Sequence, residues 1–188
     1  MKALNQRITG WCAAVMALIL PLSPCLAKDE RKIPVPVEVW RDVSTKELTI
    51  AGIGKAKDGD TLSIDGVFDV RLIGIDALER KQTCSMNDEA WKCGEEAKAL
   101  LAELVDNKRV ECENRKKEKY GRFLSVCRVG DIVLNDEMVR RGYAVAYMVP
   151  DYVDAEEEAK LSQVGAWAGD FLIPDEWRKR KRQKVRSL

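Results

Sequence analysis

Five charged residues have the types and spacing needed for chemistry on a phosphodiester. Asp60 and Asp76 are hard oxygen donors at the ends of two expected strands, and such donors favour Ca²⁺ over zinc or copper. Glu79 lies three residues after Asp76 and can accept a proton from an attacking water. Arg71 and Arg122 carry forked donors that match phosphate oxygens and the charge that develops on them. The set predicts phosphodiester hydrolysis with Glu79 as the general base.

Histidine is absent from all 188 residues. This absence excludes Ser-His-Asp triads, histidine-based nucleases and zinc enzymes with histidine ligands. Proton transfer must then use carboxylates, lysines, tyrosines, cysteines or metal-bound water.

Arg71 occupies a position that requires an anionic partner. Within the strand-like run 67–75, alternation puts Arg71 on the same face as Ile73 and Ile75. A guanidinium at the end of an apolar row is costly unless it is paired. We expect a carboxylate or a phosphate beside it.

The elements that must position these residues can be read from the pattern of apolar residues. Short β-branched runs bounded by turn signals predict five strands, over 48–57, 61–64, 67–75, 109–116 and 123–129. Apolar residues at helical spacing predict three helices, over 95–107, 135–142 and 155–167. The fold class indicated is α+β, a five-stranded OB-type β-barrel with about three helices.

The first 27 residues have the pattern of a secretory signal peptide. Two basic residues precede a short apolar stretch, and Ala27 ends the segment before a charged run. The apolar stretch is too short for a permanent membrane span, so we expect none. Lipoprotein anchoring through Cys25 is disfavoured because Pro24 precedes that cysteine. The predicted location is exported, periplasmic or extracellular.

Export gives the four cysteines after the leader a structural meaning. Four cysteines in an oxidising compartment suggest two disulfides, with three possible connectivities. An antiparallel hairpin of 109–116 and 123–129 would bring Cys112 opposite Cys127, which favours neighbour pairing and leaves Cys84 with Cys93. A zinc site is the rival interpretation, disfavoured because no Cys-x-x-Cys and no histidine is present.

Charge divides the rest of the chain. Residues 28–47 read as a linker or N-terminal arm, 48–177 as the barrel domain, and 178–188 as a basic C-terminal tail. The tail holds seven basic residues and no acid, whereas 28–177 holds 23 basic and 31 acidic residues, a net charge of −8. An acidic domain argues against a purely electrostatic nucleic-acid clamp, and we favour a solvated tail.

Three blocks of the sequence resemble the signature motifs of the staphylococcal nuclease family. They are Asp58-Gly59-Asp60-Thr61, Arg71 with Ile75-Asp76-Ala77-Leu78-Glu79, and Lys119-Tyr120-Gly121-Arg122, in the family's order. The resemblance covers about 53–167. It implies an OB-type barrel and Ca²⁺-dependent endonucleolysis of DNA and RNA that leaves 3′-phosphate ends.

The resemblance also assigns roles to single residues. It places calcium ligands at Asp60, Asp76 and the carbonyl of Ala77, the general base at Glu79, phosphate-binding arginines at Arg71 and Arg122, and substrate contacts at Lys119, Tyr120 and Tyr147. Leu78 stands where the family usually has a proline that stiffens the loop.

Three functions remain open from the sequence. The first is a secreted endonuclease, favoured because every charged site position is filled, acting on DNA and RNA with single strands preferred and as a monomer. The second is a non-catalytic OB-type module that binds single strands. The third is a nuclease-like protein that serves an envelope or exopolysaccharide pathway.

Overall fold

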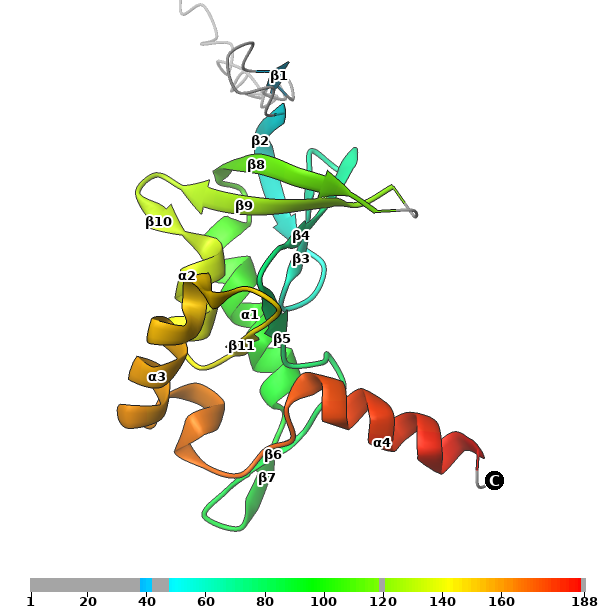
Figure 1. Cartoon of the computed structure of the whole chain (residues 1–188), viewed down its shortest axis with the longest axis vertical. Coiled ribbons are helices and arrows are strands. Elements are labelled where there is room, and N and C mark those ends of the chain that lie inside the picture. Colours follow the sequence, from blue (N-terminus) through cyan, green and yellow to red (C-terminus); the bar gives the residue numbers. More distant parts are fainter. Residues whose placement is uncertain (1–37, 42–47, 119–120, 187–188) are drawn as a thin grey trace, which may run out of the picture. The chain divides into compact units, whose positions relative to one another are not determined.

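The computed structural model of the chain describes residues 38–41, 48–118 and 121–186 (Figure 1). The predicted signal peptide, most of the predicted arm, and Lys119 and Tyr120 lie outside these residues. The strands are β1 (Glu38–Arg41), β2 (Leu48–Ala56), β3 (Thr61–Ile64), β4 (Phe68–Leu72), β5 (Ile75–Ala77), β6 (Cys84–Met86), β7 (Glu89–Trp91), β8 (Arg109–Lys117), β9 (Phe123–Val129), β10 (Ile132–Val133) and β11 (Ala144–Ala146). The helices are α1 (Cys93–Val105), α2 (Leu134–Arg140), α3 (Val153–Leu161) and α4 (Pro174–Arg186), with short 3₁₀ turns at Pro150–Tyr152 and Gly165–Ala168.

Five strands close into a barrel. β2, β3 and β4 form an antiparallel meander, β4 pairs in parallel with β9, and β9 pairs antiparallel with β8. The antiparallel pairing of β8 with β2 then closes the ring. The predicted α+β class and five-stranded OB-type barrel are therefore confirmed, and the described helices number four rather than about three.

The core fills the barrel and the space between it and the helices. β2, β3 and β4 contribute Ile50, Leu62 and Leu72, all fully buried. The apolar face predicted for α1 is also buried, including Ala97, Leu100, Leu101, Leu104 and Val105. Burial of one large aliphatic side chain stabilises a fold by about 1.5–3 kcal/mol, so this face fixes α1 against the barrel.

The strand predicted over 67–75 is divided in the structure. β4 ends at Leu72, and β5 begins at Ile75 after a turn in which Gly74 has φ +80°. A Cβ at Gly74 would lie 2.7 Å from the Tyr152 ring, so the turn requires glycine for both space and conformation. The break lets β5 leave the barrel sheet and pair with β11, where Asp76 lies opposite Val145.

Two C-terminal boundaries also differ from the sequence pattern. The helix predicted to reach Trp167 ends at Leu161, because Gln163 and Gly165 adopt positive φ values that no α-helix accommodates. Residues 178–186, which the sequence assigned to a basic tail, continue α4.

Two disulfides join neighbouring cysteines. Cys112 and Cys127 face each other in the register of the β8–β9 hairpin, with Cα atoms 4.1 Å apart. Cys84 and Cys93 are bonded across the β6–β7 hairpin, with Cα atoms 5.7 Å apart. The pairing matches the prediction and fits an oxidising, exported environment. Among the helices of the described part, none is long and apolar enough to cross a membrane.

Candidate active site

The turn before β3 places Asp60 beside Arg71 of β4. Asp60 ends the turn that leads into β3, and Thr61, the next residue, lies opposite Arg71 in the β3–β4 register. Gly59 allows this turn to approach the helix and β5 closely, because a Cβ there would lie 2.8 Å from the Cβ of Ala77. The sequence Asp-Gly-Asp-Thr thus sets a carboxylate at the rim of the barrel next to a guanidinium.

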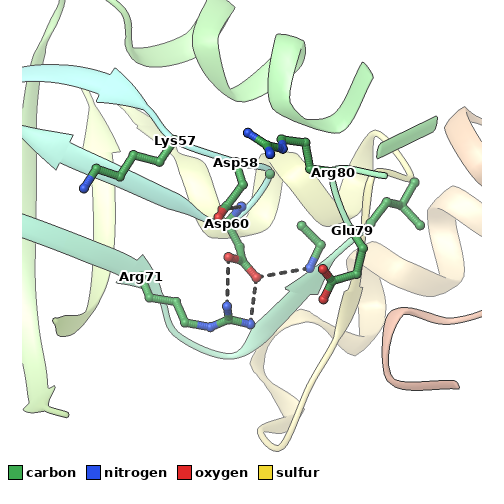
Figure 2. A pocket seen from close by; sticks show the side chains of 9 residues that line it. Lys57, Asp58, Asp60, Arg71, Glu79 and Arg80 are labelled. Carbon is green, nitrogen blue, oxygen red and sulfur yellow. Dashed lines mark hydrogen bonds and ion pairs between the residues drawn. The ribbon is translucent and has the colours of Figure 1, made fainter. Parts of the chain in front are cut away.

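Arg71 holds both buried acids. Its Nη1 and Nη2 donate to the two carboxylate oxygens of Asp60 at 3.0 and 2.7 Å, and Nη2 also donates to Asp76 Oδ1 at 3.2 Å. Figure 2 shows the forked contact with Asp60. Asp60 and Asp76 are 5% and 2% exposed, so the arginine compensates charge that water cannot reach. Arg71 has the anionic partners that its position in the strand required.

Ionisation of the Asp60 carboxyl remains unfavourable despite its contact with Arg71. Burial raises its pKa from 3.8 to about 7, and the nearby Asp58 adds to the rise, while Arg71 opposes it. The amide of Ala77 donates a weaker bond, 3.4 Å, to Asp60 Oδ2. A buried carboxylate that is still costly to ionise is a suitable ligand for an additional cation.

The donor chemistry of this pair fits a hard divalent ion. Two carboxylates and a neighbouring backbone carbonyl at Ala77 are oxygen donors of the kind that Ca²⁺ takes together with water. No cluster of three or more histidine, cysteine or acidic side chains arranged to hold a metal is present in the described residues. Any cation here would therefore depend on Asp60, Asp76, backbone oxygen and water.

A pocket of about 180 Å³ opens beside these residues. It is lined by Lys57, Asp58, Gly59, Asp60, Arg71, Ala77, Leu78, Glu79 and Arg80. Figure 2 shows the Glu79 carboxylate at this pocket. The pocket is large enough for a phosphate with its water. Its carboxylates are those of Asp58, Asp60 and Glu79, of which Asp60 is paired with Arg71.

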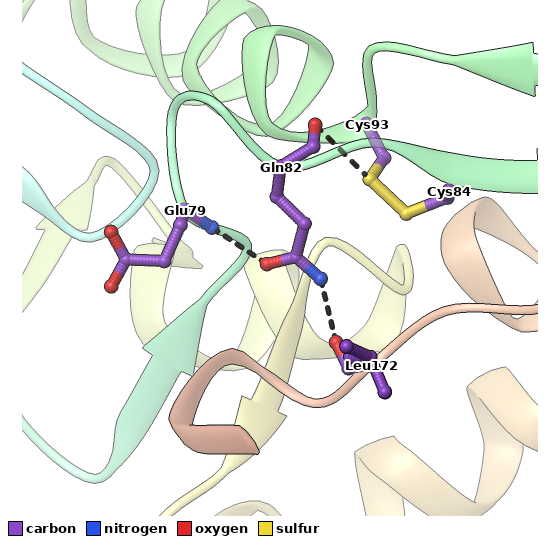
Figure 3. Close-up of a disulfide and its surroundings, with 5 residues drawn as sticks. All are labelled: Glu79, Gln82, Cys84, Cys93 and Leu172. Atoms are coloured by element: carbon purple, nitrogen blue, oxygen red, sulfur yellow. Dashed lines mark hydrogen bonds between the residues drawn. A yellow bond between two sulfur atoms is a disulfide. The ribbon is translucent and has the colours of Figure 1, made fainter. Parts of the chain in front are cut away.

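The loop that carries Glu79 is tied by a buried glutamine. Gln82, which is 1% exposed, accepts a bond from the Glu79 amide at 3.1 Å through Oε1. Its Nε2 donates to the carbonyl of Leu172 at 2.6 Å, which links the loop to the segment before α4. Figure 3 shows the side chain crossing between the two segments. Gln82 is not among the site residues predicted from the sequence.

The start of α1 packs directly under the same loop. A Cβ on Gly94 would lie 1.8 Å from the carbonyl oxygen of Glu79, so only glycine permits this approach. The Gly94 amide donates to the Gln82 carbonyl at 3.2 Å, and the disulfide of Cys93 anchors the adjacent chain. Leu78, in place of proline, is 2% exposed and packs in the core. Packing and hydrogen bonds thus constrain the loop where a proline is missing.

A third arginine reaches the site from α4. Arg178 donates to both carboxylate oxygens of Asp76, Nη1 to Oδ1 at 3.0 Å and Nη2 to Oδ2 at 2.7 Å, and Nη1 also donates to Glu79 Oε1 at 2.9 Å. These bonds, that to Asp76 first, raise the pKa of the Arg178 guanidinium, which stays protonated. The prediction of a solvated tail beginning at Arg178 is therefore wrong for this residue. The signal for a helix was Pro174 followed by Asp175 and Glu176, a typical N-terminal turn.

Other predicted site residues have different partners. Arg122 forms an ion pair with Glu118 at 2.8 Å at the end of the β8–β9 hairpin. Tyr147 follows β11 and is 42% exposed, and its amide donates to the Gly74 carbonyl. In the described part of the chain, no hydrogen bond or ion pair joins either residue to Asp60, Asp76 or Glu79. Lys119 and Tyr120 are outside the described residues.

Comparison with known proteins identifies the family of the chain. Residues 69–169, more than half of the chain, match the family model described as staphylococcal nuclease homologue. The chain belongs to the staphylococcal nuclease family. The matched region contains Arg71, Asp76 and Glu79, whereas α4 and Arg178 lie beyond it.

The chain is similar in sequence to several known proteins. An uncharacterized endonuclease of Haemophilus influenzae is 32% identical over 147 residues, covering 73% of this chain and 78% of that protein. The thermonuclease of Staphylococcus intermedius is 33% identical over 122 residues, covering 58% of this chain and 71% of its own. The succinoglycan biosynthesis protein ExoI of Rhizobium meliloti is 34% identical over 124 residues, 63% of this chain and 64% of that one. Membership of the staphylococcal nuclease family supports a nuclease, a hydrolase whose substrate is nucleic acid.

Proposed function

We propose that the protein is an exported, Ca²⁺-dependent endonuclease that hydrolyses DNA and RNA, with single strands favoured. The observation that supports it is the cluster at the barrel rim, where Arg71 contacts both Asp60 and Asp76 and the Glu79 carboxylate borders the adjacent pocket. The guanidinium of Arg71 can hold a phosphate while the carboxylate of Glu79 accepts a proton from the attacking water.

The residues divide the reaction between them. The oxygen of the water attacks phosphorus and its proton passes to the Glu79 carboxylate. The bond from phosphorus to the 5′ oxygen breaks, that oxygen takes a proton from water to become a hydroxyl, and the other product carries a 3′-phosphate. Arg71, and Arg122 from the hairpin, neutralise the charge that develops on the phosphoryl oxygens. Asp60, Asp76 and the Ala77 carbonyl would hold Ca²⁺, which when bound supplies positive charge to the phosphate. Lys119, Tyr120 and Tyr147 would contact the rest of the substrate.

The test is cleavage of single-stranded DNA and RNA oligonucleotides by the purified mature chain, in Ca²⁺ and in a chelator. We expect Ca²⁺-dependent cutting, and Glu79→Gln should lower kcat by about 100-fold or more because the general base is lost. Glu103→Gln is the matched control, since Glu103 is an exposed acid on α1, and it should retain the activity of the wild-type chain.

The same assay separates the alternatives. Tight oligonucleotide binding without cutting would replace the endonuclease with a non-catalytic OB-type binding module. Unchanged kcat in Glu79→Gln would remove Glu79 from the mechanism. Cutting that persists in the chelator would remove Ca²⁺.

A second candidate function is a role in an envelope or exopolysaccharide pathway. The observation that favours it is the 34% identity to a relative named for succinoglycan biosynthesis. Deletion of the gene should then change the amount or length of the polysaccharide produced, and restoration by Glu79→Gln would separate that role from nuclease activity.

A further inference from the structure

The helix α4 is an addition beside the candidate active site. It lies outside the region that matches the family, and it begins at Pro174, which is buried. The ion pairs of Arg178 with Asp76 and Glu79, at 2.7 and 2.9 Å, fix the helix to the site. The helix therefore extends away from Glu79, the candidate base, and the residues after Arg178 lie along this extension.

A groove runs from Glu79 along one face of α4. It has a volume of about 440 Å³, and its walls include Glu79, Trp177, Arg178, Lys181, Arg182 and Val185. Residues 177, 181 and 185 are four apart, as are 178 and 182, so they share one side of the helix. The groove starts at a residue of the site and ends on exposed basic side chains.

The chemistry of this face is cationic with apolar patches. No acidic residue follows Glu176 in the sequence, while α4 carries seven basic residues from Arg178 onward. Lys181 Nζ lies 4.9 Å from the centre of the Trp177 ring, and Val185 is 68% exposed. Cations interleaved with an aromatic ring suit a polyanion that also presents flat apolar groups, as the backbone and bases of a nucleic acid do.

We propose that α4 forms a second wall of the nucleic-acid-binding surface. The nucleic-acid strand that is cleaved beside Glu79 then continues along Lys181 and Arg182. The inference rests on the proposed function, because it extends the binding surface of the same site. It assigns the groove face of the basic segment to the substrate, and this face supplies positive charge that residues 28–177, with a net charge of −8, do not.

The sequence of α4 provides a matched pair of variants. Lys181→Gln with Arg182→Gln removes one lysine and one arginine from the groove, and Lys179→Gln with Arg180→Gln removes the same two residue types from positions that do not line it. Binding of a fluorescent single-stranded DNA oligonucleotide to the mature chain is measured by anisotropy in a chelator, so that no cutting occurs. Circular dichroism melting establishes that both variants are folded.

We expect the groove variant to bind about ten-fold more weakly and the control to change by less than about two-fold. The slope of log K against log salt should fall by about 1.4 in the groove variant, since each phosphate contact on a single strand contributes about 0.7. Equal losses in both variants, or no loss in the groove variant, would overturn the proposal. If the wild-type chain binds no oligonucleotide, the proposed function itself fails.

Anionic lipid is the rival partner for a basic helix. Cosedimentation with phosphatidylglycerol vesicles is therefore measured for the same two variants. Vesicle binding that is lost only in the groove variant, together with unchanged oligonucleotide binding, would assign the face to a membrane surface and overturn the proposal.

Discussion

Arg178 places a positive charge beside Asp76, one of the acids proposed to hold Ca²⁺. The carboxylates of Asp60, Asp76 and Glu79 already contact two guanidinium groups, those of Arg71 and Arg178. A cation held by Asp76 must share oxygens that already accept two bonds from Arg178. The arginine should therefore lower the affinity of the site for Ca²⁺.

Arg178→Gln is expected to bind Ca²⁺ about ten-fold more tightly than the wild-type chain, because one competing charge is removed. Isothermal titration without nucleic acid measures this directly, and ten-fold corresponds to about 1.4 kcal/mol. Arg180→Gln loses the same charge from an exposed position on α4 and should leave the affinity unchanged. Weaker binding in Arg178→Gln would instead mean that the guanidinium organises the acids for the metal.

The sequence predicted part of this cluster and missed the rest for a physical reason. Asp60, Arg71, Asp76 and Glu79 lie within 20 residues, on strands and turns whose periodicity and turn chemistry are local. Arg178 contacts Asp76 across 102 positions of the chain, and Gln82 contacts Leu172 across 90. No local pattern encodes which distant segment returns to the site, so only the folded arrangement shows these partners.

The loop between β5 and β6 depends on Gln82 for its shape. The glutamine satisfies the Glu79 amide and the Leu172 carbonyl in a buried place, and an unpaired buried group costs about 1–3 kcal/mol. Gln82→Met conserves volume but removes both bonds. We expect kcat to fall at least ten-fold at a temperature well below the melting transition, with oligonucleotide Kd within about two-fold, because the base moves while the binding surface remains.

Gln163→Met is the control for this variant, since Gln163 is an exposed glutamine beyond the end of α3. It should match the wild-type chain in kcat and melting temperature. A kcat for Gln82→Met that recovers on cooling in parallel with the folded fraction would indicate a loss of stability alone, and Gln82 would then have no positioning role.

The barrel as a whole was predictable, whereas the boundaries that shape the site were not. Alternating β-branched runs and the turns between them predict five strands and a barrel, and the strand pairing confirms the barrel. The apolar alternation continues through Ile73 and Ile75, so it conceals the turn at Gly74, where the Tyr152 ring leaves no space for a Cβ. Helix α4 was missed because its residues are almost all charged and lack an apolar stripe.

The two disulfides are expected to contribute similarly to the free energy of unfolding but differently to activity. In the chain-entropy model the Cys112–Cys127 bond, which spans 15 positions, contributes about 3 kcal/mol, and the Cys84–Cys93 bond, which spans 9, contributes slightly less. Replacing either pair with alanine should therefore lower the free energy of unfolding by a similar amount, measured by urea denaturation. Only the second pair lies beside the loop of Glu79 (Figure 3).

Activity should separate the two variants. At 25 °C, with both still folded, we expect the Cys84→Ala and Cys93→Ala variant to lose at least ten-fold in kcat, and the Cys112→Ala and Cys127→Ala variant to stay within about two-fold. Release of the Cys84–Cys93 bond frees the chain next to Gln82, whose carbonyl accepts a bond from the Gly94 amide, and so loosens the base. The Cys112–Cys127 bond ties the β8–β9 hairpin away from that loop. Equal losses of kcat in the two variants would show that the bond near Glu79 acts only through overall stability.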